Sequence, residues 1–163
     1  MMSELRQRLS SLSGREYSVL DILTRAQRIE DEQRVHWVQQ SVDERLTLAE
    51  AYLEHAQACD VQRETECRQA ISRASYSLHH AGRAVAYEVR RRDVTTHEGV
   101  IDEVSQIVGE EMAGVVRKQH RLRNHVEYEL YLPWSDVPTQ AEVALTQAGE
   151  VLSRCRACVA GRR

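Results

Sequence analysis

Hydrophobic residues recur along the chain at alternating steps of four and three from Ser41 onward. This spacing puts them on one face of an α-helix, where they can pack against other helices. Ser41 and Glu44 have the spacing of a capping box, which satisfies free backbone N–H groups at a helix start, so we expect the helix to begin at Ser41. Its apolar stripe consists of Val42, Leu46, Ala49, Leu53 and Ala56.

Four further segments show the same helical period. Alternation of the strand type never exceeds four residues, so the sequence predicts an all-α fold, an antiparallel helical bundle of four to five core helices with short loops. The predicted helices run from about Val61 to Arg92, from the capping pair Thr95 and Glu98, from about Glu110, and from the capping pair Thr139 and Glu142.

The first 40 residues are less regular. Helical stretches are expected around Ser3–Leu12 and Tyr17–Glu30, separated by the breaker-rich Ser10–Gly14. We therefore predict a helical N-terminal extension over residues 1–40, in front of a helical bundle over residues 41–163. The extension is expected to dock on the bundle near Val35, Trp37 and Val38.

Composition narrows the class of protein. The 163 residues suffice for one domain, and seven Gly, two Pro and no Phe argue against a turn-rich β-sandwich. No apolar run approaches the roughly 20 residues that span a bilayer, and the first 20 residues lack the apolar block of a secretory signal. We therefore expect a cytoplasmic protein that does not bind membranes. Cys155 and Cys158 form a CxxC inside a helical pattern and are expected to be reduced.

The net charge of −3 means that any binding of nucleic acid must come from a local patch. One candidate patch is a ridge of basic and aromatic residues on the predicted helix from Val61 to Arg92, where the residues recur at steps of three or four beside the apolar stripe. Such a mixture is typical of contact surfaces and of phosphate recognition, and the alternative is an ordinary exposed face rich in arginine. The ridge consists of Arg73, Tyr76, His80, Arg83 and Tyr87.

A second ridge follows Glu110. No acidic residue falls between Glu111 and Glu127, so this segment carries four unopposed positive charges. Arginine can stabilise charge on a phosphate and a near-neutral histidine can move a proton, so the segment could cleave RNA without a metal, or could instead form a dimer interface. The ridge consists of Arg117, Arg121, Asn124 and Tyr128, with His120 and His125 beside it.

No metal or cofactor is expected. His79, His80 and His97 lack carboxylate or cysteine neighbours at ligand spacing, and the chain has no glycine-rich phosphate loop.

Three segments, in order, resemble motifs of small prokaryotic HEPN proteins. Residues 72–84, SRASYSLHHAGRA, resemble the helix SRAYYAxFHAARA of that family, and residues 96–101, THEGVI, resemble its THxGVI. Residues 123–128, RNHVEY, are similar to its RxxxDY ending. The match covers roughly Ser41–Leu130 and does not explain residues 1–40.

The resemblance implies a HEPN helical bundle that forms a homodimer and buries the two polar ridges in a shared cleft. Many HEPN proteins are metal-independent endoribonucleases of toxin or antiviral type, often encoded beside a nucleotidyltransferase that acts as antitoxin. Active members carry an arginine, a polar residue and, after a gap of four to six residues, a histidine. Here the histidine position counted from Arg123 holds Tyr128, and counted from Arg121 the histidine arrives one residue early, at His125.

Three functions follow as hypotheses. The first is an RNA-cleaving toxin or defence protein, regulated by a nucleotidyltransferase-type antitoxin or a defence-complex subunit, with Arg121 or Arg123 on the scissile phosphate and His125 as acid or base. The second is a catalytically silent HEPN module that binds a nucleotidyltransferase, a nucleotide or RNA, and the third is a plain helical assembly subunit. The candidate catalytic residues are Arg121, Arg123, Asn124, His125 and Tyr128; the candidate residues of an RNA-binding or dimer cleft are Arg73, Tyr76, His80, Arg83, Arg117 and His120.

Overall fold

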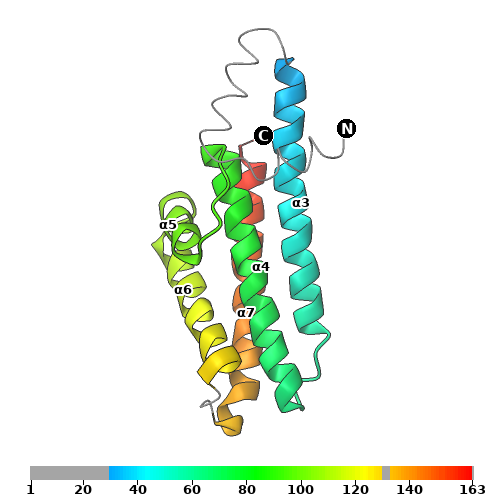
Figure 1. Ribbon diagram of the computed structural model, residues 1–163, viewed down its shortest axis with the longest axis vertical. Helices are drawn as coiled ribbons and strands as arrows, with labels where there is room; N and C mark the ends of the chain where they lie inside the picture. The colour runs from blue at the N-terminus through cyan, green and yellow to red at the C-terminus, as the bar shows by residue number, and fades with distance from the viewer. Residues whose placement is uncertain (1–29, 130–132, 163) are drawn as a thin grey trace.

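The computed structural model describes residues 30–129 and 133–162. These residues form five α-helices, a π-helical turn η1 and a short 3-10 helix η2, and the described part contains no strand (Figure 1). The predicted all-α helical bundle is therefore confirmed. The elements are α3 (Asp31–Gln57), α4 (Glu64–Arg90), α5 (His97–Ile107), α6 (Glu110–Asn124), η1 (His125–Glu129), η2 (Trp134–Asp136) and α7 (Val137–Ala160).

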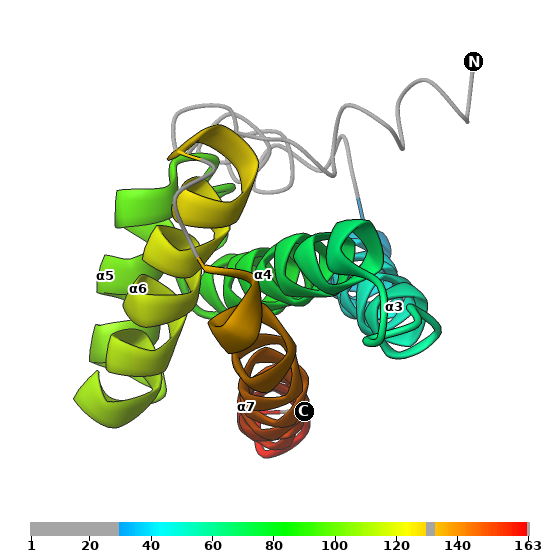
Figure 2. The same ribbon diagram turned by 90° about the horizontal axis from the view of Figure 1, so that it is seen from below.

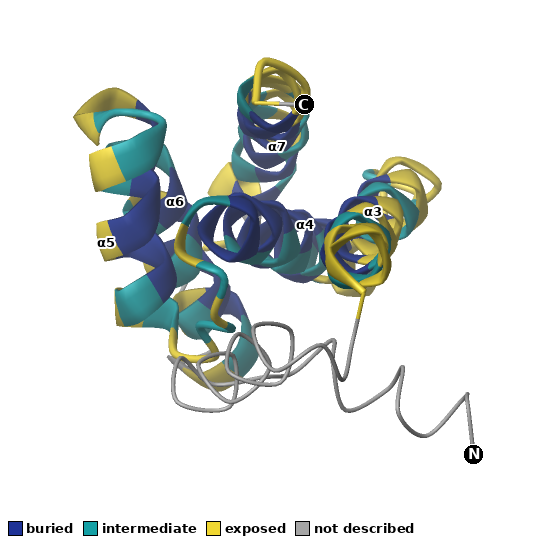
Figure 3. Ribbon diagram, turned by 90° about the horizontal axis from the view of Figure 1, so that it is seen from above, coloured by how far each residue is buried: buried dark blue, intermediate teal, exposed yellow. Residues whose placement is uncertain are grey.

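Helix α4 is the centre of the bundle. Figure 2 shows it between α3 on one side and the α5–α6 pair on the other, with α7 against a third side. Figure 1 shows that α3 and α6 run antiparallel to α4, whereas α7 runs in the same direction as α4. The buried faces of the helices point inward toward α4 (Figure 3). The apolar stripe of α4 is fully buried and consists of Ile71, Ala74, Leu78, Ala81 and Val85.

Helix α5 approaches α4 closely because residue 82 is a glycine. A Cβ atom at Gly82 would lie 2.5 Å from Cγ1 of Val100 and 2.9 Å from Cγ2 of Val104. The absence of this atom lets the two backbones come together and sets the position of the first residue of α5, His97.

The beginning of α3 differs from the prediction. The helix begins at Asp31 rather than at Ser41, and Ser41 is buried inside it. The helix therefore passes unbroken through the predicted boundary at residues 40 and 41, and the division of the chain into extension and bundle stays a prediction. Val38 is buried, as expected for a docking residue, while Val35 is 48% exposed. The helical stretches predicted within residues 1–29 lie outside the described residues.

The starts of α5 and α7 are shifted by a residue or two. Thr96 rather than Thr95 caps α5, since its hydroxyl oxygen accepts a hydrogen bond from the backbone N–H of Gly99 at 3.1 Å. Helix α7 begins at Val137 rather than near Thr139, because Pro138 fits the first turn of a helix, where its missing N–H costs nothing.

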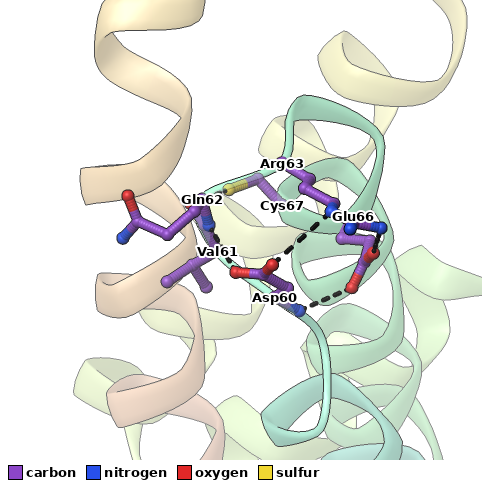
Figure 4. Close-up of polar contacts among 6 residues, drawn as sticks. All are labelled: Asp60, Val61, Gln62, Arg63, Glu66 and Cys67. Atoms are coloured by element: carbon purple, nitrogen blue, oxygen red, sulfur yellow. Dashed lines mark hydrogen bonds and ion pairs between the residues drawn. The ribbon is translucent and has the colours of Figure 1, made fainter.

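The turn between α3 and α4 is held by its own polar side chains (Figure 4). The backbone N–H of Asp60 donates to Oε2 of Glu66 at 2.6 Å, and Arg63 lies 3.6 Å from the Asp60 carboxylate and 3.4 Å from that of Glu66. The thiol of Cys67 donates to the carbonyl of Val61 at 2.9 Å. These contacts fix the start of α4, which begins at Glu64 rather than at Val61.

None of the helices that the structure describes combines the length and the apolar character that a bilayer crossing requires. All four cysteines are free. Burial raises the pKa of Cys155 to about 12, so this residue of the CxxC is a packing residue rather than a reactive thiol.

Candidate functional site

The ridge on α4 meets the end of α6 at Arg123, one of the predicted catalytic residues. The guanidinium carbon of Arg123 lies 4.5 Å from the ring centroid of Tyr76. One of its nitrogens, Nη1, lies 3.4 Å from Nε2 of His97, the first residue of α5. Three helices therefore converge on Arg123, and Tyr76 is the member of the first ridge that takes part in the contact.

These contacts belong to a closed circuit of side chains. The Tyr52 ring of α3 stacks on Tyr76 at 5.4 Å between centroids and on His80 at 5.3 Å. His79 touches its neighbour His80 edge-on at 5.6 Å and packs against His97 at 4.4 Å. The circuit, which we call the histidine–tyrosine ring, consists of Tyr52, Tyr76, His79, His80, His97 and Arg123. His120 of α6 lies beside it, stacked on His97 at 4.1 Å.

The histidines of this cluster are uncharged at neutral pH. Burial lowers the pKa of His79 to about 3 and that of His80 to about 4, and the positive charge of Arg83 adds to both effects. Burial, followed by the charge of Arg123, also lowers the pKa of His120. The pKa of His97 is lowered by burial and then by His120 and Arg123. Neutral imidazoles can accept a proton, which is the property required of a general base.

Arg123 is held by the residue one turn after it. Its Nη2 donates to Oε2 of Glu127 at 2.8 Å, and the hydroxyl of Ser72 donates to the other oxygen of the same carboxylate. Burial would raise the pKa of Glu127, but the hydrogen bonds from Arg123 and Ser72 lower it below its usual range. Arg123 is 7% exposed, so its guanidinium is buried between the helices rather than open to solvent.

Two members of the ridge on α4 stabilise the fold rather than line an open cleft. Arg83 donates to Asp93 through Nε at 3.1 Å, and Arg45 reaches the same carboxylate at 3.2 Å. The Arg45 guanidinium covers the ring of Tyr87, whose side chain is 1% exposed. Burial would raise the pKa of Asp93, but the two arginines lower it. The Arg83–Asp93–Arg45 group thus ties α3 and α4 to the loop after α4.

The predicted catalytic set is divided between two sides of the α6–η1 helix. Arg123 is buried against Tyr76, and Asn124 is half-buried. Arg121, His125 and Tyr128 are exposed, and Tyr128 is 72% exposed.

In the second ridge, Arg117 forms an ion pair at 3.2 Å with Glu110, the first residue of α6. His120 is the member of this ridge that reaches the histidine–tyrosine ring.

Four residues of the site were missed by the sequence analysis as functional candidates. Tyr52 lies three residues after Ala49 and four before Ala56, so the helical spacing alone could have placed it beside the apolar stripe. Glu127 lies four residues after Arg123, which is the spacing of a helical ion pair. His79 and His97 were considered only as metal ligands, and no sequence signal shows that their imidazoles pack against one another.

A hollow of about 530 Å³ lies between α4 and η1, next to the ring. Its walls include Arg68, Ser72, Arg73, Tyr76 and Glu127. The guanidinium of Arg73 lies 5.8 Å from the Tyr52 ring, and among the described residues no carboxylate lies within 4.0 Å of it. Two hollows of 450 and 580 Å³ elsewhere on α3 contain none of the predicted site residues.

Within residues 30–129 and 133–162, no three His, Cys, Asp or Glu side chains are arranged to hold a metal ion. His97 and His120 stack face to face and His79 is tilted by 48° against His97, whereas ligation would require the imidazole nitrogens to converge on a point. The arrangement suits proton transfer and anion binding better than metal binding.

Searches with this sequence match no protein-family model and no curated protein. What the protein does must therefore be inferred from its residues and from the geometry of this site.

Proposed function

We propose that this chain is a HEPN-type protein of toxin or defence class that cleaves RNA without a metal ion and acts as a homodimer. The observation that carries the proposal is the meeting of Arg123 with His97 and His120, in which a guanidinium lies 3.4 Å from a neutral imidazole that stacks on a second one. Arginine and histidine together supply what phosphodiester cleavage needs. The HEPN-like motifs point to the same class of reaction.

The chemistry follows from these groups. A neutral imidazole, His97 or His120, takes the proton of a ribose 2′-OH, and the 2′-oxygen attacks the adjacent phosphorus. The bond from phosphorus to the 5′-oxygen of the next nucleotide breaks, and that oxygen takes up a proton from a protonated imidazole or from water. The products are a 2′,3′-cyclic phosphate and a free 5′-hydroxyl. The positive charge of Arg123 favours the charge that builds on the phosphate during this step.

A second candidate function is a binding module that does not cleave RNA. The pairing of Arg123 with Glu127 favours it, because the carboxylate neutralises the cation expected to act on the phosphate. No arginine on this helix completes the arginine-to-histidine spacing of active HEPN proteins. In this case the ring would hold RNA, a nucleotide or a nucleotidyltransferase partner without reaction.

An RNA cleavage assay separates the two candidates. Purified protein is incubated with end-labelled RNA in EDTA, and the first candidate predicts fragments that end in 2′,3′-cyclic phosphate. His97→Gln should lower the rate by about 10²–10⁴-fold, the usual contribution of an acid–base group. His55→Ala, an exposed histidine on α3, is the matched control and should keep the parental rate. Parental activity in His97→Gln contradicts the assignment of His97, and intact RNA that stays bound supports the binding module.

His125 provides a further comparison, because it is the histidine that the motif alone would select. Loss of cleavage in His125→Ala with normal cleavage in His97→Gln would move the acid–base role from the ring to the exposed face of η1. In cells, the toxin proposal predicts growth arrest on expression, relieved by His97→Gln. Light scattering tests the dimer, and a monomer at micromolar concentration contradicts it.

A further inference from the structure

The hollow between α4 and η1 has the size and the polar lining of a ligand site. Its volume of about 530 Å³ lies within the range of small-molecule sites in proteins, roughly 300–1,000 Å³. Tyr76 belongs both to its wall and to the histidine–tyrosine ring. A molecule in the hollow would therefore lie next to the groups proposed to cleave RNA.

Of the two arginines that line this hollow, Arg73 is the one whose N–H groups make no hydrogen bond within the described residues. The other arginine, Arg68, uses Nε and Nη2 on Glu64 and Nη1 on the carbonyl of Val126. Arg73 lies over the face of Tyr52 and, within the described residues, makes no hydrogen bond or ion pair; it is half-buried. A partly buried guanidinium with free donors is suited to a phosphate, which it can bind through two parallel hydrogen bonds.

Glu127 supplies acceptors on the opposite wall. An ionised carboxylate has about four acceptor positions, and Ser72 and Arg123 use one on each oxygen. The side chain is 26% exposed, so the remaining positions can accept hydrogen bonds from hydroxyl or amino groups. A ligand that satisfies both walls carries an anion at one end and hydrogen-bond donors at the other, and a ribonucleotide has this composition.

The hollow, of about 530 Å³, suits one unpaired nucleotide better than a base pair with its two backbones. An A-form duplex presents its bases stacked and paired, so a single strand is the RNA that can place a nucleotide there. We propose that this hollow binds one unpaired nucleotide of an RNA strand, with Arg73 on the phosphate and Glu127 accepting from the ribose or the base. This proposal rests on the proposed function, because the bound strand is the RNA that the residues of the histidine–tyrosine ring would cleave.

The test measures binding separately from cleavage. A fluorescent 12-nucleotide single-stranded RNA is titrated by anisotropy at 0.1 M salt in the His97→Gln background, which keeps the strand intact. Adding Arg73→Ala should weaken binding about 10–100-fold, the value of one charged hydrogen-bonding group. Arg154→Ala removes an equal charge from the exposed face of α7 and should change binding less than twofold. The same RNA annealed to its complement should bind at least 10-fold more weakly than the single strand.

Each outcome bears on a different claim. Equal losses in Arg73→Ala and Arg154→Ala, or equal binding of duplex and single strand, overturn the nucleotide site. If the parent leaves RNA intact while Arg73→Ala loses binding, the cleavage proposal fails and the nucleotide site stands. If the parent cleaves RNA and Arg73→Ala binds it normally, the nucleotide site fails and cleavage stands. Competition with AMP then distinguishes a site that also takes the free nucleotide from one that needs the strand.

Discussion

Nη1 of Arg123 lies 3.4 Å from Nε2 of His97, although 26 residues separate the two in the chain. The contact joins the end of α6 to the first residue of α5 and places a permanent cation beside an imidazole. The cation and burial together disfavour the protonated imidazole, so His97 stays a proton acceptor at neutral pH.

Acidification should destabilise the protein through His79. The pKa of this histidine is about 3 when folded and about 6.5 when unfolded, so between these values the unfolded chain binds more protons. The contribution of neutral His79 to stability is complete above pH 6.5 and falls as the pH falls toward 3. Urea unfolding should show a loss of about 2 kcal/mol from this residue between pH 7 and pH 5, with a further loss from His80.

The slope of stability against pH identifies the source of this loss. His79→Gln should flatten the slope between pH 6.5 and 4.5, where Asp93 and Glu127, whose pKa values are lowered, remain ionised. His55→Gln, on an exposed position, should keep the parental slope. A slope in His79→Gln as steep as that of the parent would show that His79 titrates normally in the folded protein.

Glu127→Gln should destabilise the fold more than an ordinary surface ion pair would. The substitution leaves the charge of Arg123, 7% exposed, without its carboxylate. We expect a loss of about 1–3 kcal/mol in urea unfolding at pH 7, less than for a fully buried pair because Glu127 is 26% exposed.

Glu64→Gln is the matched control for this ion pair. Glu64 pairs with Arg68 at 2.8 Å but is 49% exposed, so its loss should cost at most about 0.5 kcal/mol. Equal effects of the two substitutions would mean that Arg123 finds solvent or another partner when Glu127 is neutral.

Thiol reactivity should follow burial. Cys67 and Cys155 are fully buried and Cys155 has a pKa of about 12, so neither should react with DTNB in the native protein at pH 8. Cys59 and Cys158 are half-buried and should react first, and all four should react in urea. Rapid native labelling of Cys155, located by mass spectrometry, would show that the C-terminal part of α7 opens readily.

Helical periodicity was sufficient to predict the bundle, because the apolar stripe of α4 is long and regular and every member of it is buried. It was insufficient at the start of α3, where Asp31 to Gln40 is mostly polar and only Val38 is buried. The starts of the other helices were predicted to within a few residues, since neighbouring residues such as Thr95 and Thr96 are equally good caps by sequence.

The site was predicted in part. The sequence analysis selected Tyr76, His80, His120 and Arg123 as candidate site residues, and these residues do lie at the histidine–tyrosine ring. It could not show that Arg123 turns inward, because that depends on Glu127 and Ser72 meeting from different helices. The packing of His97 between His79 and His120 likewise depends on how closely α5 packs on α4, a distance that no local pattern contains.

The distance between α5 and α4 can be changed by adding a single methyl group at Gly82. Gly82→Ala places a methyl group 2.5 Å from Cγ1 of Val100 and 2.9 Å from Cγ2 of Val104, so α5 must move away from α4. We expect a net loss of about 1–3 kcal/mol in urea unfolding from overpacking. Gly114→Ala on α6 meets no atom within 4 Å and should instead stabilise by about 0.5–1 kcal/mol through helix propensity. Because His97 lies three residues before Val100, RNA cleavage by Gly82→Ala should also fall while that of Gly114→Ala does not. A Gly82→Ala protein as stable as the parent would show that α5 can shift freely, and the Arg123–His97 contact would then not be fixed by the packing of α5.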